Sequence, residues 1–204
     1  IDFNKKNIEL FIKPFFSKVD LEKLKISSNN QFSFRIDKKF RLSKLKLDSK
    51  VSIDETEIRN KFRLKNFFPN IKENLYFSDH ELAVKYDKDN LIIDGKGNIL
   101  LQDNNDAIEY SINKKNNFFD FNTILKIKNN PLEINFLNYK NNEKNEVVIQ
   151  LSGSKSKKNK IFIKSFNINE KKNNISIENL GLNNEYKIIK LDSIVLNYVD
   201  KEKQ

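Results

Sequence analysis

The stretch Phe166–Val199 reads FNINEKKNNISIENLGLNNEYKIIKLDSIVLNYV, and apolar residues alternate with polar ones along much of it. One polar residue separates Phe166 from Ile168, and another separates Ile175 from Ile177. Alternation places such apolar side chains on one face of a β-strand and the polar ones on the other. A lysine-rich turn lies between the two pairs. The stretch therefore predicts an antiparallel hairpin with one apolar face.

The same alternation recurs from about residue 26 to the end of the chain. Its clearest examples are Phe32-x-Phe34-x-Ile36, Ile108-x-Tyr110-x-Ile112 and Leu132-x-Ile134-x-Phe136. Between the alternating runs lie clusters of turn-forming residues, at 37–39, 87–90, 94–97, 128–131 and 141–142. Regular spacing of this kind is typical of an antiparallel meander. We predict an all-β fold, a curved, mostly antiparallel sheet of repeated hairpins, with any helix confined to residues 5–25 or 62–74.

Some apolar residues follow one another at a step of three. Phe40-x-Leu42-x-x-Leu45-x-Leu47 has the same spacing as Ile175-x-Ile177-x-x-Leu180-x-Leu182, which suggests a weak internal repeat. A step of three would move the apolar set to the other face unless one residue bulges out of the strand. Bulges bend and twist a sheet, so regular bulges predict a curved one.

The polar residues on alternate positions indicate that only one face of the sheet is dry. Strands buried on both faces would read as continuous apolar runs, and most of these strands do not. The dry face needs a cover, which could be a second sheet, the same sheet curling over, or a ligand. The sequence leaves these three alternatives open.

The composition of the 204 residues argues against several classes of protein. Ala83 and Ala107 are the only alanines, which disfavours a helical bundle, and the chain has no Cys, no Met and one His. The formal net charge is +10, but only four of the 38 cationic residues are Arg. Arg is the preferred residue for reading phosphates and bases, so we do not expect a specific nucleic-acid partner. No apolar run approaches the ~18 residues of a transmembrane helix.

No catalytic or metal-binding constellation stands out, and we predict a protein that is not an enzyme and has no cofactor. The run Gly95-Lys96-Gly97-Asn98 lacks the rest of a P-loop and favours a turn between two strands. The run at 103–106 lacks the Gly and Glu of a calcium loop and favours a polar turn. The single imidazole, His80, stands between Asp79 and Glu81, where a ligand or general-base role is conceivable but a second His is missing. The lysine-rich segment 154–160 favours a solvated loop over a patch for anionic lipid head groups.

Phe32–Ile53, FSFRIDKKFRLSKLKLDSKVSI, and Phe166–Val199 resemble the AsmA-like superfamily, and within it the large YhdP-type proteins of Gram-negative envelopes. Leu91–Ile112, LIIDGKGNILLQDNNDAIEYSI, and Leu132–Lys140, LEINFLNYK, are similar to that family as well. The similarity covers most of the chain but contains no invariant catalytic residue.

The resemblance implies a long, curved antiparallel sheet that shields phospholipid acyl chains in an apolar groove between the inner and outer membranes. It implies a periplasmic location, an inner-membrane anchor outside this chain, and envelope proteins as further partners. We expect residues 1–204 to be a fragment of a longer repetitive β domain, with a short helix or edge segment over 1–25. The residues expected to line the groove are Phe32, Phe34, Ile36, Phe40, Leu42, Ile108, Tyr110, Ile112, Ile134, Phe136, Ile163, Ile175 and Ile177.

Two other classes stay open on the sequence. A structural or adhesive surface β-sandwich would have the same alternation, with its apolar face sealed by a second sheet. A carbohydrate-processing β-enzyme would need paired carboxylates in a cleft, which the sequence does not indicate.

Overall fold

The computed structural model of the chain describes residues 2–4, 21–60, 64–116, 118–156, 160–185 and 187–198; within these ranges the side chains of 2–4, 21 and 42 lie outside the description. Almost all the regular structure is β, as the sequence predicts, and the sheet is not closed into a barrel. The helix in the described residues is one 3₁₀ turn, Asn135–Leu137, which does not lie in either segment where helix was expected.

The strands are mostly long. They are β1 Asp2–Asn4, β2 Leu21–Ile36, β3 Leu42–Arg59, β4 Asn74–Asp87, β5 Asn90–Leu100, β6 Asp106–Lys115, β7 Phe118–Ile127, β8 Glu133–Ile134, β9 Tyr139–Lys140, β10 Val147–Lys155, β11 Ile161–Glu170, β12 Asn173–Leu182, β13 Ile188–Lys190 and β14 Ser193–Asn197.

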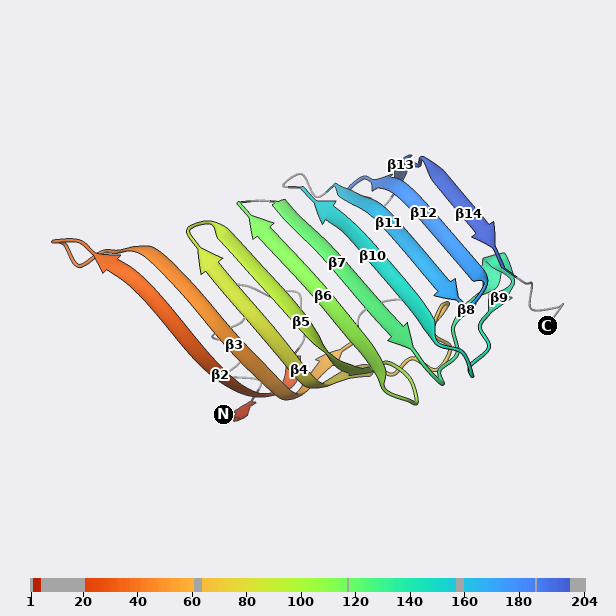
Figure 1. Cartoon of the computed structure of the whole chain (residues 1–204), viewed down its shortest axis with the longest axis horizontal. Coiled ribbons are helices and arrows are strands. Elements are labelled where there is room, and N and C mark those ends of the chain that lie inside the picture. Colours follow the sequence, from red (N-terminus) through yellow and green to blue (C-terminus); the bar gives the residue numbers. More distant parts are fainter. Residues whose placement is uncertain are drawn as a thin grey trace.

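Twelve of these strands form one antiparallel sheet in which most neighbours in the chain are neighbours in space. Its order is β1-β2-β3-β4-β5-β6-β7-β10-β11-β12-β13, and β14 also pairs with β12, while β8 and β9 form a separate two-stranded sheet. Figure 1 shows the large sheet as a single twisted layer, with β8 and β9 near one end of its last strands. Residues 21–25, expected in a helix or edge segment, belong to β2, and β1 pairs with the outer edge of β2 through Lys23–Lys25. Residues 5–20 lie outside the described residues.

The register keeps the apolar side chains aligned from strand to strand. Residues directly opposite each other in an antiparallel pair share a face. Successive partners across five strand pairs are Ile108, Leu125, Ile149, Ile168, Ile175 and Leu196. We call the side of the large sheet that carries this row, and the residues in register with it, the apolar face.

Bulges occur where the three-residue steps predict them. Between Leu42 and Leu45, Lys44 adopts a left-handed conformation with φ 53°, and the β2–β3 register shifts beside it. Between Ile177 and Leu180, Asn179 has φ 55°. The neighbouring strand β11 bulges at the same level. Leu151 pairs with Phe166 and Gly153 with Ile163, so two residue steps in β10 lie opposite three in β11. Each bulge returns the following apolar residue to the apolar face, so the prediction is confirmed.

The core lies at one end of the strands, where two long connections fold over the apolar face. We call this end, with the described segments 64–73, 101–105, 128–146 and 171–172, the loop rim. The opposite end, which carries the β2–β3, β4–β5, β6–β7, β10–β11 and β12–β13 turns, is the turn rim. At the loop rim, Phe68, Leu132 and Tyr139 from the two connections pack on Ile127 and Val147 of the sheet.

One predicted turn is wrong. Asp94–Gly97 lies inside β5, paired with β4 on one side and β6 on the other. Neither glycine has a positive φ. These glycines leave room for rings instead: a Cβ on Gly95 would lie 2.5 Å from Cζ of Tyr110, and one on Gly97 would lie 2.3 Å from Cδ2 of His80.

The expected strand through Leu132, Ile134 and Phe136 is reduced to β8, Glu133–Ile134, which lies outside the large sheet. Pro131 has no N–H for a sheet ladder, and the segment leaves the large sheet to fold back over it. Leu132 and Ile134 are buried in the core. Phe136 lies on the 3₁₀ turn and is 80% exposed.

We predict that Gly95→Ala destabilises the protein by about 1–3 kcal/mol, because the new methyl group forces the Tyr110 ring and Leu82 to move. Gly to Ala in an open strand position would instead be neutral or stabilising. Urea unfolding followed by circular dichroism measures the difference.

Gly181→Ala is the matched control. Its Cβ would meet its nearest atom, Cβ of Lys190, at 3.1 Å, so we expect a change below about 1 kcal/mol. In a Tyr110→Ala background, Gly95→Ala should lower the free energy of unfolding by less than it does in the parent. An equal cost in both backgrounds would contradict the role given to the ring.

Candidate functional site

The apolar face contains most of the residues that the sequence assigns to a groove. Ile108, Tyr110 and Ile112 of β6 lie opposite Leu125, Thr123 and Phe121 of β7. On the last strands, Ile163 pairs with Leu180, Phe166 with Ile177, and Ile168 with Ile175. Tyr110 also pairs with Gly95, and Ile112 with Ile93. These side chains thus form continuous rows across the strands.

Rings from neighbouring strands cover three glycines on this face. Tyr110 covers Gly95, His80 covers Gly97, and Cζ of Phe121 lies 2.8 Å from the position of a Cβ on Gly153. A flat ring over a glycine fills the space of the missing side chain and keeps the apolar row continuous. The glycines therefore smooth the face rather than turn the chain.

At the loop rim, buried polar side chains fasten the two connections to the sheet. Gln102, fully buried, accepts a hydrogen bond from the Asn70 N–H at 3.1 Å and donates from Nε2 to the Pro131 carbonyl at 2.8 Å. One side chain thus holds both connections. The Glu133 N–H also donates directly to the Phe67 carbonyl, at 2.9 Å.

Asp106 makes a second set of hydrogen bonds that holds a connection to the sheet. Its carboxylate accepts hydrogen bonds from the Lys128 N–H and from Nδ2 of Asn130, each at 3.0 Å. Nδ2 of Asn130 also donates to the Asn104 carbonyl at 2.7 Å. Burial raises the pKa of Asp106 to about 6, although both hydrogen bonds act in the opposite direction.

Glu170 makes a third set of hydrogen bonds of this kind. Its carboxylate accepts from the Tyr139 hydroxyl at 3.0 Å, from the Asn142 N–H at 2.9 Å and from Nδ2 of Asn145 at 2.9 Å. Burial raises the pKa of this carboxyl, but the hydrogen bonds outweigh burial and hold the pKa below its usual value. These contacts close the loop rim, so the apolar face is covered there by the protein itself.

The turn rim is open by contrast. Large apolar side chains of the described residues lie exposed along it. They are Phe32, Phe34, Ile36, Phe40, Leu45, Phe118, Phe119, Ile188, Ile189 and Leu191. Of these, Phe32 is 66% exposed and stacks on Phe34 with ring centroids 6.1 Å apart. In the described residues, no second large sheet covers this part of the apolar face.

His80 is a structural residue in this arrangement. It is buried, donates from Nε2 to the Asn98 carbonyl at 2.8 Å, and lies edge-on to Phe77 with centroids 5.4 Å apart. Burial lowers the pKa of the imidazole, so the ring is neutral at pH 7. Among the described residues, no three His, Cys, Asp or Glu side chains group as metal ligands would.

Two hollows lie on the other, polar face of the sheet. The larger, of about 650 Å³, is lined by residues of β3–β7 that include Glu81, Asp94 and Glu109. Lys96 pairs with Glu81 at 3.0 Å, and Lys126 with Glu109 at 3.0 Å. Both ion pairs are exposed to solvent, so each contributes little to stability.

The structure places three of the predicted groove residues, Phe40, Ile134 and Phe136, away from the apolar face. Phe40 lies in the β2–β3 turn with φ 57°, not on a strand. Ile134 belongs to the small β8–β9 sheet and Phe136 to the 3₁₀ turn, as described above, so neither lines the apolar face. Leu42 begins β3, but its side chain lies outside the described residues.

The sequence did not indicate the buried hydrogen bonds of Gln102, Asp106 and Glu170, or the glycines that are covered by rings. The Asn-rich runs at 103–106 and 128–131 signal loops, but nothing in them indicates that Asn104 and Asn130 bind each other.

Comparison of the chain with protein-family models, with curated proteins and with solved structures gave no match. In the described residues, no helix has the length and apolar character needed to cross a membrane.

The Asp106 carboxyl predicts a pH dependence. Its folded pKa, about 6, is higher than its unfolded value near 3.8. The folded state therefore binds more protons between these values. The stability from this group is complete below pH of about 4 and is lost as the pH rises to about 6.

As the pH rises through that interval, we expect the free energy of unfolding of the parent to fall by about 1–3 kcal/mol relative to that of Asp106→Asn. Above the interval, the difference should stay constant. Urea titrations of both proteins at a series of pH values measure this difference. A constant difference from pH 4 to 8 would contradict the buried position of the carboxyl.

Proposed function

We propose that the chain is a segment of an envelope protein that shields phospholipid acyl chains along its apolar face, for transport between the inner and outer membranes. In this proposal the protein is periplasmic, its membrane anchor lies outside this chain, and no chemical reaction takes place. The proposal follows the likeness to AsmA-like proteins of the YhdP type.

The observation that carries the proposal is the open apolar face of a single sheet. Rows of apolar side chains run across the strands, and toward the turn rim they include the exposed side chains of Phe32 and Phe119. Exposed apolar patches of this extent mark a binding surface for another apolar partner.

The physical driving force needs no specific bond. Each methylene removed from water contributes about 0.8 kcal/mol, so an acyl chain lying on the rows gains stability in proportion to its length. Head groups can stay in water beside the Lys and Asn side chains of the rim. Most members of these rows are apolar, so a lipid could slide along them from strand to strand. Thr123, opposite Tyr110, is a polar member, and at β2–β3 one row ends in Ser49 and Asn30, which hydrogen-bond to each other.

The adjacent residues Phe121 and Asn122 of β7 allow a direct test. Phe121 lies on the apolar face opposite Ile112, and Asn122 lies on the polar face opposite Ser111. Each is replaced singly by the photoreactive p-benzoylphenylalanine and irradiated with radiolabelled phosphatidylethanolamine in detergent micelles. We expect a lipid crosslink from position 121 and at least tenfold less from position 122.

Thermal unfolding of both variants checks that the fold is intact. Equal crosslinking from the two positions would refute lipid binding on the apolar face. Crosslinks from position 121 to a second protein chain, with none to lipid, would favour the structural β-sandwich, in which another sheet seals the face.

A further inference from the structure

The β2–β3 hairpin extends beyond the rest of the sheet. Pairing between β3 and β4 ends at Lys46 and Asp87, and β1 reaches only Lys23–Lys25 of β2. Residues 34–45 therefore pair only with each other among the described residues. In Figure 1 this hairpin projects past the β4–β5 turn at the turn rim.

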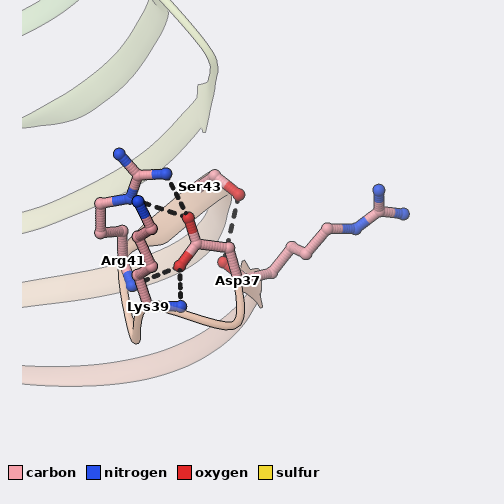
Figure 2. A network of polar contacts seen from close by, with 5 residues as sticks. Asp37, Lys39, Arg41 and Ser43 are labelled. Carbon is pink, nitrogen blue, oxygen red and sulfur yellow. Dashed lines mark hydrogen bonds and ion pairs between the residues drawn. The ribbon is translucent and has the colours of Figure 1, made fainter.

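The hairpin tip is held in one conformation by Asp37 (Figure 2). Its carboxylate accepts from the Lys39 N–H at 2.7 Å, the Arg41 N–H at 3.0 Å and Nε of Arg41 at 2.8 Å. The Ser43 hydroxyl donates to the Arg35 carbonyl at 3.2 Å across the ribbon. A free two-stranded ribbon is only marginally stable in water. The Asp37 contacts therefore order a segment that, within the described part of the chain, pairs only with itself.

The ordered tip presents apolar side chains to solvent. Phe40, at its apex, is 89% exposed, and Ile36 and Leu45 are 52% and 46% exposed. Phe40 also has φ 57°, a conformation that a bulky residue adopts only with strain and that Asn or Gly adopts readily. A strained, solvent-exposed Phe suggests a role outside the fold.

The same tip is strongly basic. Residues 34–45 contain five cationic residues and one carboxylate, a formal net charge of +4 out of +10 for the whole chain. The carboxylate, Asp37, is already paired with Arg41 at 2.7 Å. The side chains of Arg35, Lys38, Lys39 and Lys44 are exposed around Phe40.

We propose that the β2–β3 hairpin tip docks on the surface of an anionic phospholipid bilayer, with Phe40, Ile36 and Leu45 entering the head-group region. Aromatic and aliphatic side chains ringed by Lys and Arg suit this interface, because their apolar parts leave water while the cations stay at the phosphates. Neither signal alone gives firm attachment, but the two together do. The proposal does not rest on the lipid-conduit function, since docking requires only the tip.

A charge reversal with a matched control tests the electrostatic part. Lys38 and Lys39 occupy the β2–β3 turn at the turn rim, and Lys171 and Lys172 occupy the β11–β12 turn at the loop rim. The double variants K38E/K39E and K171E/K172E change the net charge equally. Cosedimentation with phosphatidylcholine vesicles, with and without phosphatidylglycerol, measures binding.

We expect the parent to bind the anionic vesicles, and to bind less tightly as salt is raised. Since each cation near an anionic surface contributes about fivefold to binding, K38E/K39E should lose at least tenfold, and K171E/K172E should stay within about threefold of the parent. Equal loss in the two variants would overturn the proposal, because it would show attraction through net charge alone.

Phe40 tests the apolar part. Phe40→Asn should leave the thermal stability unchanged or raised, because Asn accepts the left-handed conformation. It should weaken vesicle binding at least about fivefold, because the apex no longer leaves water. A loss of stability without a loss of binding would assign Phe40 to the fold and overturn its role.

Tryptophan fluorescence measures how deeply the hairpin tip enters the bilayer. Because the chain has no Trp, a single introduced Trp gives the whole signal. Phe40→Trp should shift to the blue on anionic vesicles and be quenched by brominated lipid. Phe136→Trp, at a site 80% exposed on the loop-rim connection, should do neither. No quenching at position 40 would overturn the proposal. If the protein does not bind vesicles, and the hairpin tip instead mediates self-association or oligonucleotide binding, the proposal is also overturned.

Photocrosslinking from position 121 in micelles separates this proposal from the proposed function. K38E/K39E should retain that crosslink, because micellar lipid needs no bilayer docking. Loss of vesicle binding with the crosslink intact would support the hairpin's role alone, whereas vesicle binding with no crosslink in any protein would refute only the conduit.

Discussion

Strand-to-strand register that keeps apolar residues on one face is the constraint on which the rest of this protein depends. A slip of one residue in any strand would move its whole apolar set to the polar side. Rows such as Ile108, Leu125 and Ile149 stay aligned because the meander has few crossings and short turns at one rim. Where the spacing of apolar residues breaks, Lys44 and Asn179 take the left-handed conformation and the row resumes after the bulge.

The alternation in the sequence was enough to predict the sheet, its antiparallel meander and the bulges at Lys44 and Asn179, because these depend on local spacing. It did not indicate the register shift at Asp79 in β4. It was not enough to interpret Gly95 and Gly97. Glycine between Asp and Lys favours a turn by composition, and only the tertiary contacts with Tyr110 and His80 explain a strand there. The alternation in segment 132–136 was misleading for the opposite reason. It serves two contacts on the core and one exposed Phe136, and its pairing is confined to the small β8–β9 sheet.

The two rims of the sheet differ physically. At the loop rim, Gln102, Asp106 and Glu170 each make at least two hydrogen bonds, so the connections lie firmly on the apolar face. Such networks are invisible in sequence, because their members come from segments separated by more than 20 residues. At the turn rim, apolar side chains and lysines lie together in solvent. This asymmetry is what connects the fold to the proposed partners: acyl chains on the face and an anionic membrane at the hairpin tip.

Solvent access to the apolar face is the central claim, and spin labelling measures it most directly. The chain has no Cys, so Ile112→Cys and Asn113→Cys can each carry a single nitroxide on opposite faces of β6. Without lipid, the label at position 112 should be relaxed by a water-soluble nickel complex. With phospholipid added it should be accessible to oxygen alone, while the label at position 113 stays accessible to nickel throughout. A label at position 112 that is shielded from nickel and oxygen before any lipid is added would contradict the account, because it would show a sealed core.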